Sequence, residues 1–177
     1  MACAWDELAT DPTFAIRVAT FADATAVTDV LEASYPELMR PAYHEAVLQR
    51  ALPAMVRANP KLLASGTYFV AIANDDFAVG CGGWTHEKPG TGEVQPGVAH
   101  LRHFATRPGW TGHGIGRRIY DRCEAEARAA GVSSLEVYAS MNAPAFYAAL
   151  GFSRIDDITV ALAQTIEFPS VWMRRRI

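Results

Sequence analysis

Glycines occupy every second position in one short stretch of the chain, Thr111-Gly-His-Gly-Ile-Gly116. An Ala/Glu/Arg-rich run with helical periodicity follows from Arg117, so a helix is predicted to begin at this turn. Backbone N–H groups at a helix N-terminus lack partners and lie at the positive end of the helix dipole. The glycines leave these groups open to a ligand because no Cβ stands in the way. The stretch therefore predicts binding of phosphate or a similar anion.

Spacing excludes two common phosphate-binding motifs. A P-loop has Lys and then Ser or Thr after its last glycine, whereas Arg117 and Arg118 stand here. A dinucleotide-binding fingerprint has Gly-x-Gly-x-x-Gly in the first strand–helix unit, whereas this spacing is Gly-x-Gly-x-Gly, late in the chain. On this motif alone, a glycine turn without a ligand is the alternative.

Hydrophobic periodicity, together with the positions of glycine and proline, predicts the helices and strands that position the turn. The strand that leads into it covers residues 98–106, and a period of two places His100, Arg102 and Phe104 on one face and His103 on the other, under a helix. In chain order, the predicted elements are a strand (14–20), a helix from Asp23 to a break at Tyr35-Pro36, a helix (42–50), a short helical piece between Pro53 and Pro60, a hairpin (67–87), a loop (88–97), the strand before the turn, the helix after it, a strand (135–139), a helix from Asn142 to Leu150, and two closing strands (153–160 and 166–176). This order predicts a mixed sheet covered by helices.

The amino-acid composition indicates a globular protein. The 177 residues are half hydrophobic and one fifth charged, with a net charge of −3, which is typical of one globular domain (1–177) with a polar leader (1–12). No basic patch predicts nucleic-acid binding, and no apolar run approaches the ~20 residues of a membrane span. Three scattered cysteines favour a reducing, cytoplasmic location, and no histidine pair has metal-ligand spacing, so no metal is expected.

A second motif, Asn142-Ala-Pro-Ala-Phe-Tyr-Ala-Ala-Leu-Gly-Phe152, lies after the predicted helix and strand. It resembles the segment that closes the cofactor site of the GCN5-related N-acetyltransferase (GNAT) family, and the glycine turn resembles that family's Arg/Gln-x-x-Gly-x-Gly/Ala loop in all but its first residue. The resemblance covers residues 98–155 well. It implies an α+β fold with a mixed, mostly antiparallel sheet, a splayed central strand pair and flanking helices.

The resemblance also implies acetyl-CoA as the acyl-donor cosubstrate. Its pantetheine arm would lie along the strand before the turn and its pyrophosphate on the turn itself, with Asn142 bonding the pantetheine amide or capping its helix. Thr111 departs from the family's Arg or Gln, which removes a cationic contact. The implied cofactor-binding residues are Phe104, Ala105, Thr106, Thr111, Gly112, His113, Gly114, Ile115, Gly116, Arg117, Asn142 and Tyr147.

Two catalytic residues are implied in the same way. Tyr147 matches the family's tyrosine beside the CoA sulfur, where a phenol can protonate the departing thiolate. His100 matches the strand position that often carries the general base, and its reference pKa of ~6.5 suits the task. His86, Glu87 or a water relay are the alternatives for the base.

The expected activity is transfer of an acetyl group to a primary amine by direct attack in a ternary complex. The acceptor is expected to be a small molecule or peptide amine, with Tyr35, Tyr43, Trp84 and His86 as candidate wall residues of its site. A homodimer is compatible with the sequence. A non-catalytic acyl-CoA sensor or interaction domain on the same fold is the alternative function.

Overall fold

The computed structural model describes residues 13–162 and 165–177, and the expected polar leader (1–12) lies outside them. The described residues form a seven-stranded sheet in the order β1-β2-β3-β4-β5-β7-β6, in which only β4 and β5 pair in parallel. The elements are β1 (Phe14–Val18), α1 (Ala24–Met39), α2 (Glu45–Met55), α3 (Pro60–Leu63), β2 (Tyr68–Ala73), β3 (Ala78–Thr85), β4 (Val98–Thr106), α4 (Ile115–Ala129), β5 (Ser134–Ser140), α5 (Pro144–Ala149), β6 (Ser153–Leu162) and β7 (Ile166–Arg176). The mixed, mostly antiparallel sheet predicted from the sequence is confirmed.

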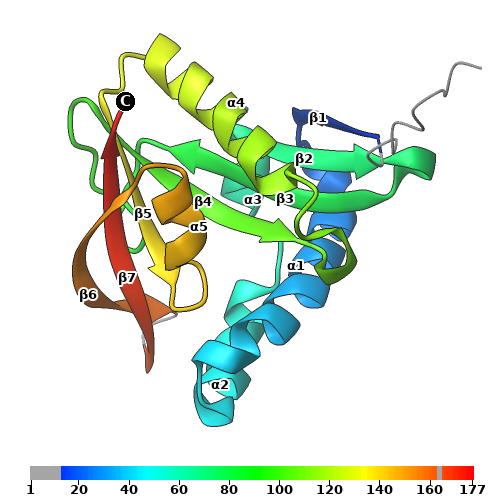
Figure 1. Cartoon of the computed structure of the whole chain (residues 1–177), viewed down its shortest axis with the longest axis horizontal. Coiled ribbons are helices and arrows are strands. Elements are labelled where there is room, and N and C mark those ends of the chain that lie inside the picture. The colour runs from blue at the N-terminus through cyan, green and yellow to red at the C-terminus, as the bar shows by residue number, and fades with distance from the viewer. Residues whose placement is uncertain (1–12, 163–164) are drawn as a thin grey trace, which may run out of the picture.

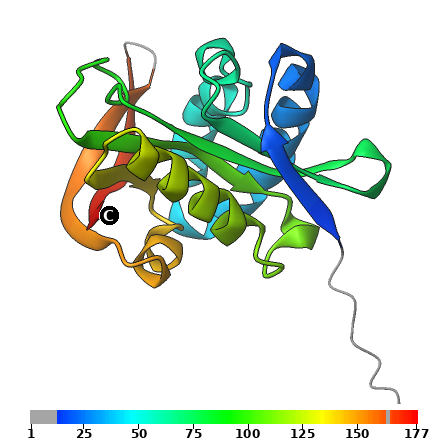
Figure 2. The same ribbon diagram turned by 90° about the horizontal axis from the view of Figure 1, so that it is seen from above.

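Helices cover both faces of the sheet (Figures 1 and 2). On one face, α4 and α5 pack over a core that includes Val79, Ile119 and Leu135. On the other face, α1 to α3 cover a second core that includes Leu31 and Val70. The glycine turn thus joins the middle of the sheet to a helix on one face, while α1 lies on the opposite face.

Helix α1 does not end at Tyr35-Pro36, as the sequence pattern predicted, but continues through Pro36 to Met39. A proline inside a helix removes one hydrogen bond from the ladder and disfavours a helical conformation at the preceding residue. Here Tyr35 and Met39 are both buried against the sheet. This burial stabilises the last turn, so tertiary packing outweighs the local preference.

Strand β4 contains a bulge that the period-two pattern did not predict. Gly80 pairs with Thr106 and Cys81 with Ala105, but Gly83 pairs with Arg102, so β4 has one extra residue opposite Gly82. The extra residue reverses the alternation of side chains beyond it. Phe104 therefore packs in the α4-side core. The prediction that His100 and Phe104 share a face is wrong for this reason.

Strands β4 and β5 separate along their length. They pair only from Val98 with Ser134 to His100 with Glu136. Beyond His100, the β5 side of β4 has no strand partner in the described part of the chain. The predicted splayed strand pair is thus present, and the gap between the two strands lies next to the glycine turn and α5.

Candidate functional site

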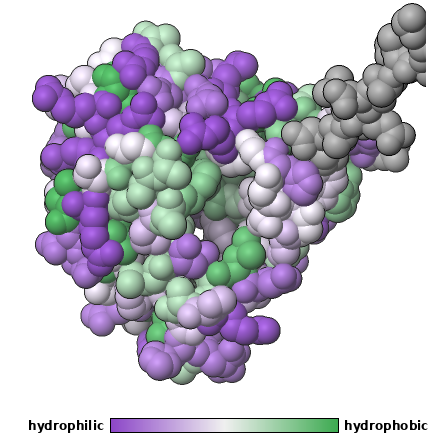
Figure 3. All heavy atoms as spheres, in the orientation of Figure 1, coloured by the Kyte–Doolittle hydropathy of each residue, from purple (hydrophilic) through white to green (hydrophobic). Residues whose placement is uncertain are grey.

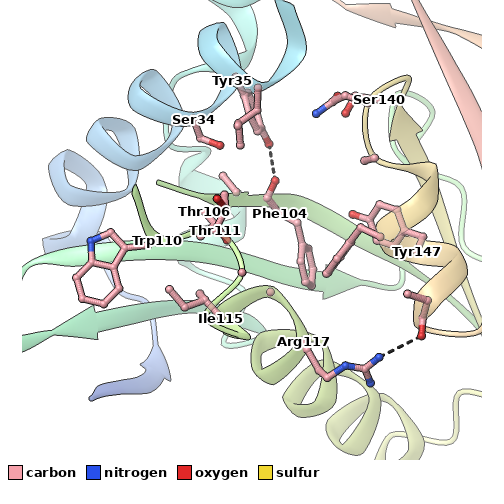
Figure 4. A pocket seen from close by; sticks show the side chains of 18 of the residues that line it. Ser34, Tyr35, Phe104, Thr106, Trp110, Thr111, Ile115, Arg117, Ser140 and Tyr147 are labelled. Atoms are coloured by element: carbon pink, nitrogen blue, oxygen red, sulfur yellow. Dashed lines mark hydrogen bonds between the residues drawn. The ribbon is translucent and has the colours of Figure 1, made fainter. Parts of the chain in front are cut away.

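A cavity of about 480 Å³ opens between the glycine turn, β4, α1 and α5, and we call it the turn cavity (Figure 4). Most of the residues predicted to hold a cofactor line it. These are Phe104, Ala105, Thr106, Thr111, Gly112, Gly114, Ile115, Gly116, Arg117, Asn142 and Tyr147. His113 is the exception, because it does not line the cavity and its Nδ1 lies 3.1 Å from the carbonyl oxygen of Thr111.

Free backbone donors are the main chemical feature of the turn cavity. Helix α4 begins at Ile115, with Gly114 as its N-cap in the left-handed conformation (φ 75°). In the described part of the chain, the backbone N–H groups of residues 112–117 donate no hydrogen bond, and the first that does is Arg118, to Gly114. This row of donors lies at the positive end of a 15-residue helix, an arrangement that suits an anion.

The side chains around the turn add few free charges. The Thr111 hydroxyl donates to the Pro108 carbonyl at 2.9 Å, so it already has a partner. Arg117 lines the cavity and donates from Nη2 to the Ala149 carbonyl at 3.1 Å, which ties α4 to α5. The guanidinium of Arg117 is therefore the cation placed beside the free amides.

Tyr147 and Phe104 meet where the strands separate. Their ring centroids are 6.4 Å apart, and Figure 4 shows both rings between β4 and α5. The Phe104 ring lies over Gly82, where an added Cβ would come within 2.7 Å of it. The Phe104 carbonyl accepts a hydrogen bond from the Tyr35 hydroxyl at 3.3 Å. Burial raises the pKa of Tyr147 above its ordinary value, so the phenol stays protonated at neutral pH.

A second cavity of about 250 Å³, the central cavity, lies on the α1 and α2 side of the gap. Tyr35, Phe104 and Tyr147 line both cavities, so the two meet at the separation of β4 and β5. A group bound in the turn cavity can therefore contact a molecule in the central cavity. Of the four predicted acceptor-wall residues, Tyr35 alone lines the central cavity.

His103 occupies the bulge of β4 and lines the central cavity, on the sheet face that α1 and α2 cover. Its φ of 47° is left-handed, which is uncommon for a residue other than glycine and is tolerated by histidine better than by most. Its carbonyl accepts a hydrogen bond from the Tyr68 hydroxyl at 3.0 Å, and its Nδ1 is buried with no partner among the described residues. The bulge therefore holds an imidazole in the wall of the central cavity.

His100 lies outside both cavities. Its side chain is 3% exposed, with Nδ1 3.9 Å from a carboxylate oxygen of Glu136. Burial lowers the pKa of His100, and Glu136 partly offsets this. Glu136 itself also accepts hydrogen bonds from Trp172 and Arg174. The position predicted to carry the general base therefore belongs to a polar group that His100 of β4 forms with Glu136 of β5 and with Trp172 and Arg174 of β7.

The other predicted residues lie away from the junction. Trp84, His86 and Glu87 line a third cavity of about 620 Å³, the polar cavity, at the end of β3. Tyr43 lines none of the three cavities; its hydroxyl donates to the Pro169 carbonyl at 2.7 Å. Asn142 lines the turn cavity but does not cap α5, whose N-cap is Ala143.

Sequence reasoning missed several residues of the turn cavity. The ring of Phe146 lies beside Tyr147, with centroids 5.0 Å apart, and its place in the second motif could have indicated it. Trp110 directly precedes the glycine turn, and Ala143, Ala149 and Leu150 belong to the second motif, so their positions could have indicated them in the same way. The others are Ser34, Leu38 and Met39 on α1 and Ser140 on β5, for which the two motifs carry no signal.

The surface around the cavities has both apolar and hydrophilic parts. Figure 3 shows a hollow near the centre of this face, with apolar surface around it and hydrophilic surface over α4. Among the described residues, no group of three or more His, Cys, Asp or Glu is arranged to hold a metal ion. No helix in that part of the chain is both long and apolar enough to cross a membrane.

His103 predicts a dependence of stability on pH. Burial lowers its pKa to about 4, and Arg102 adds to the effect. Between about pH 4 and the unfolded value of ~6.5, the unfolded chain binds a proton that the folded chain does not, so stability falls as pH drops through this window. His103→Asn, which tolerates the left-handed backbone, should reduce that fall in urea unfolding measured at several pH values. If the free energy of unfolding of His103→Asn fell with pH as steeply as that of the control His113→Asn, His103 would not be the cause of the pH dependence.

Comparisons with known proteins agree with this geometry. A sequence model of the acetyltransferase (GNAT) family matches residues 26–152. A GCN5-related N-acetyltransferase structure from Rhodopseudomonas palustris is 24% identical, with a TM-score of 0.73 over 93% of this chain and 96% of that one. The PaiA N-acetyltransferase from Thermoplasma acidophilum, solved with coenzyme A, is 16% identical, with a TM-score of 0.69 over 93% and 99%.

A GNAT-family acetyltransferase from Brucella melitensis, solved with acetyl-CoA, is 22% identical, with a TM-score of 0.56 over 80% of this chain and 84% of that one. No curated protein is significantly similar in sequence. At these identities the solved structures show a shared fold, and the family match covers most of the chain, including both motifs. The chain belongs to the GNAT family of acetyltransferases.

Proposed function

We propose that this protein transfers the acetyl group of acetyl-CoA to a primary amine. The row of free N–H groups at residues 112–117, which opens into the turn cavity, is the observation that carries the proposal. These groups match the CoA pyrophosphate, and the open β5 side of β4 matches the amides of the pantetheine arm. Two relatives with the same fold were solved with coenzyme A or acetyl-CoA, which supports the donor.

The reaction would take place at the junction of the two cavities. The amine nitrogen attacks the thioester carbonyl carbon, and the carbon–sulfur bond breaks. Tyr147, which lines both cavities and stays protonated, gives its proton to the leaving sulfur. Neither Cys81 nor Cys123, both buried, lines a cavity, which favours direct attack over an acyl-cysteine. Bringing the two reactants together supplies much of the rate.

The base is proposed to be His103 rather than His100. His103 lines the central cavity, and its buried Nδ1, which has no partner among the described residues, can accept a proton from the amine. Burial lowers its pKa to about 4, so the ring is neutral at pH 7 but is a weaker base than a free imidazole. His100 reaches neither cavity. His86 and Glu87 line the polar cavity, so either would need a chain of water molecules. The variant His103→Asn, assayed for turnover, tests the role; wild-type turnover would remove it.

Acetyl-CoA should stabilise the folded protein. At a free concentration ~100 times its Kd, a ligand of the native state adds about 2.7 kcal/mol to stability. For a domain of this size, that corresponds to a rise of roughly 5–10 °C in Tm. The measurement is a thermal melt with increasing acetyl-CoA, with NAD as the control that should produce no shift. No shift with saturating acetyl-CoA would refute the cofactor assignment.

An assay for free CoA thiol distinguishes an enzyme from a non-catalytic acyl-CoA sensor on the same fold. An N-acetyltransferase releases free CoA thiol when a suitable amine is present, and a sensor binds acetyl-CoA without release. We expect release with at least one amine from a panel. Stabilisation by acetyl-CoA with no release from any amine would favour the sensor.

A further inference from the structure

The central cavity shares lining residues with the turn cavity and with the polar cavity, and the latter two share none. Tyr147 lines both the turn cavity and the central cavity. Arg102 lines both the central cavity and the polar cavity. If the thioester reacts beside Tyr147, as the proposed function requires, the amine of the acceptor lies at that end. Arg102 then marks the opposite end of the acceptor.

The wall between these two ends is mostly apolar. No Asp or Glu is among the described residues that line the central cavity, and Arg102 is its one permanent charge. Burying an ammonium group without a partner costs several kcal/mol, so an acceptor with a second cation is disfavoured here. The apolar lining residues include Met39, Met55, Val137, Val160, Leu162 and Phe168.

Part of the Arg102 guanidinium is free to bind a ligand. Its Nη1 donates to the Thr85 hydroxyl at 2.9 Å and to the Glu87 carbonyl at 3.4 Å, and both acceptors are neutral. In the described part of the chain, its Nε and Nη2 donate no hydrogen bond and it forms no salt bridge. Burial lowers the pKa of Arg102, partly offset by the charge of Glu87, but a guanidinium remains protonated at neutral pH. Two adjacent free N–H edges on a cation suit a carboxylate.

We propose that the acceptor is an amino carboxylate in which an apolar body separates the primary amine from the carboxylate, an inference that rests on the proposed function. The carboxylate binds Arg102 at the border with the polar cavity. The apolar body fills the central cavity, and the amine reaches the junction beside Tyr147. Diamines and polyamines are poor acceptors because their second cation meets Arg102.

Matched pairs of acceptors test the proposal. The probes are 4-(aminomethyl)benzoate and 6-aminohexanoate, each compared with its primary amide, and butane-1,4-diamine. Thiol release from acetyl-CoA measures kcat/KM for each. We expect each carboxylate to exceed its amide about tenfold, mainly through KM, because one charge-assisted contact of this kind corresponds to such a ratio. The diamine should be slower than either carboxylate.

Substitutions of Arg102 test whether this residue causes the preference for carboxylates over amides. Arg102→Gln should bring the carboxylate-to-amide ratio close to one, and Arg102→Lys should restore part of it. Arg107→Gln is the matched control, because Arg107 follows β4, donates to the Ala78 carbonyl at 2.7 Å and lines none of the three cavities. The control should keep the full ratio. The Tm shift with acetyl-CoA, measured for each variant, verifies that the donor site is intact.

The outcomes separate this inference from the proposed function. Equal rates for carboxylates and amides, a preference for the diamine, or a ratio that persists in Arg102→Gln would overturn the inference and leave acetyl transfer standing. Acetyl-CoA stabilisation with no thiol release from any probe would also overturn it. Loss of acetyl-CoA binding in the wild-type protein would overturn both.

Discussion

Gly114→Ala is expected to weaken acetyl-CoA binding about tenfold or more. Gly114 is the N-cap of α4, and no atom lies within 4 Å of the position that its Cβ would take. The new methyl group would therefore stand in the open turn cavity, in front of the free N–H groups that are proposed to bind the pyrophosphate. Its φ of 75° also strains an alanine, which costs about 1–2 kcal/mol in stability. The affinity is measured by titrating the variant with acetyl-CoA.

Gly131→Ala separates these two effects. Gly131 follows the other end of the same helix, has a φ of 81°, and likewise has open space at its Cβ position. The strain should be similar, but Gly131 does not line the turn cavity. We expect both variants to lose stability to a similar extent and only Gly114→Ala to lose affinity. Equal affinities for acetyl-CoA would show that the pyrophosphate does not bind at this turn.

Tyr147→Phe is expected to lower kcat by about 10²-fold while the Kd for acetyl-CoA changes little, because general acid catalysis contributes on that scale. The Tyr147 hydroxyl makes no hydrogen bond within the described part of the chain, and the residue is 5% exposed at the junction of the two cavities. Removing the hydroxyl keeps the ring that packs against Phe104 and Phe152. Steady-state kinetics with an accepted amine, together with an acetyl-CoA titration, measure the two quantities.

Tyr120→Phe is the control for this prediction. Tyr120 is a buried tyrosine of α4 whose hydroxyl accepts a hydrogen bond from Arg175 at 2.7 Å, and it lines neither the turn cavity nor the central cavity. Its variant should lose some stability and keep wild-type turnover. If Tyr147→Phe also turned over at the wild-type rate, the phenol would have no part in proton transfer.

Much of the fold and donor site could be predicted because the signals are local. The alternating glycines and the helical run after them place the start of α4 and its free N–H groups within one continuous stretch. The segment from Asn142 to Phe152 likewise contains α5 and Tyr147. Of the predicted donor-site residues, His113 alone does not line the turn cavity, although its backbone N–H belongs to the row of free donors, because the direction of a side chain in a turn does not follow from glycine spacing.

The acceptor side could not be predicted in this way. The alternation of side chains in β4 is a local rule, but the extra residue opposite Gly82 depends on how β4 pairs with β3. That pairing moves Phe104 to the α4 side and brings His103 into the central cavity. For this reason we propose His103, and not His100, as the base.

The sequence by itself determined the family, the mixed sheet and the start of α4 with its free N–H groups, because each depends on residues that are neighbours along the chain. Only the tertiary structure decided which side chains meet at the proposed reaction centre and at the far end of the central cavity. Tyr147 and Arg102 come from α5 and β4, and the space between them is enclosed by side chains of α1, α2, β5, β6 and β7. Such a space depends on contacts between residues remote in sequence, which no spacing pattern encodes.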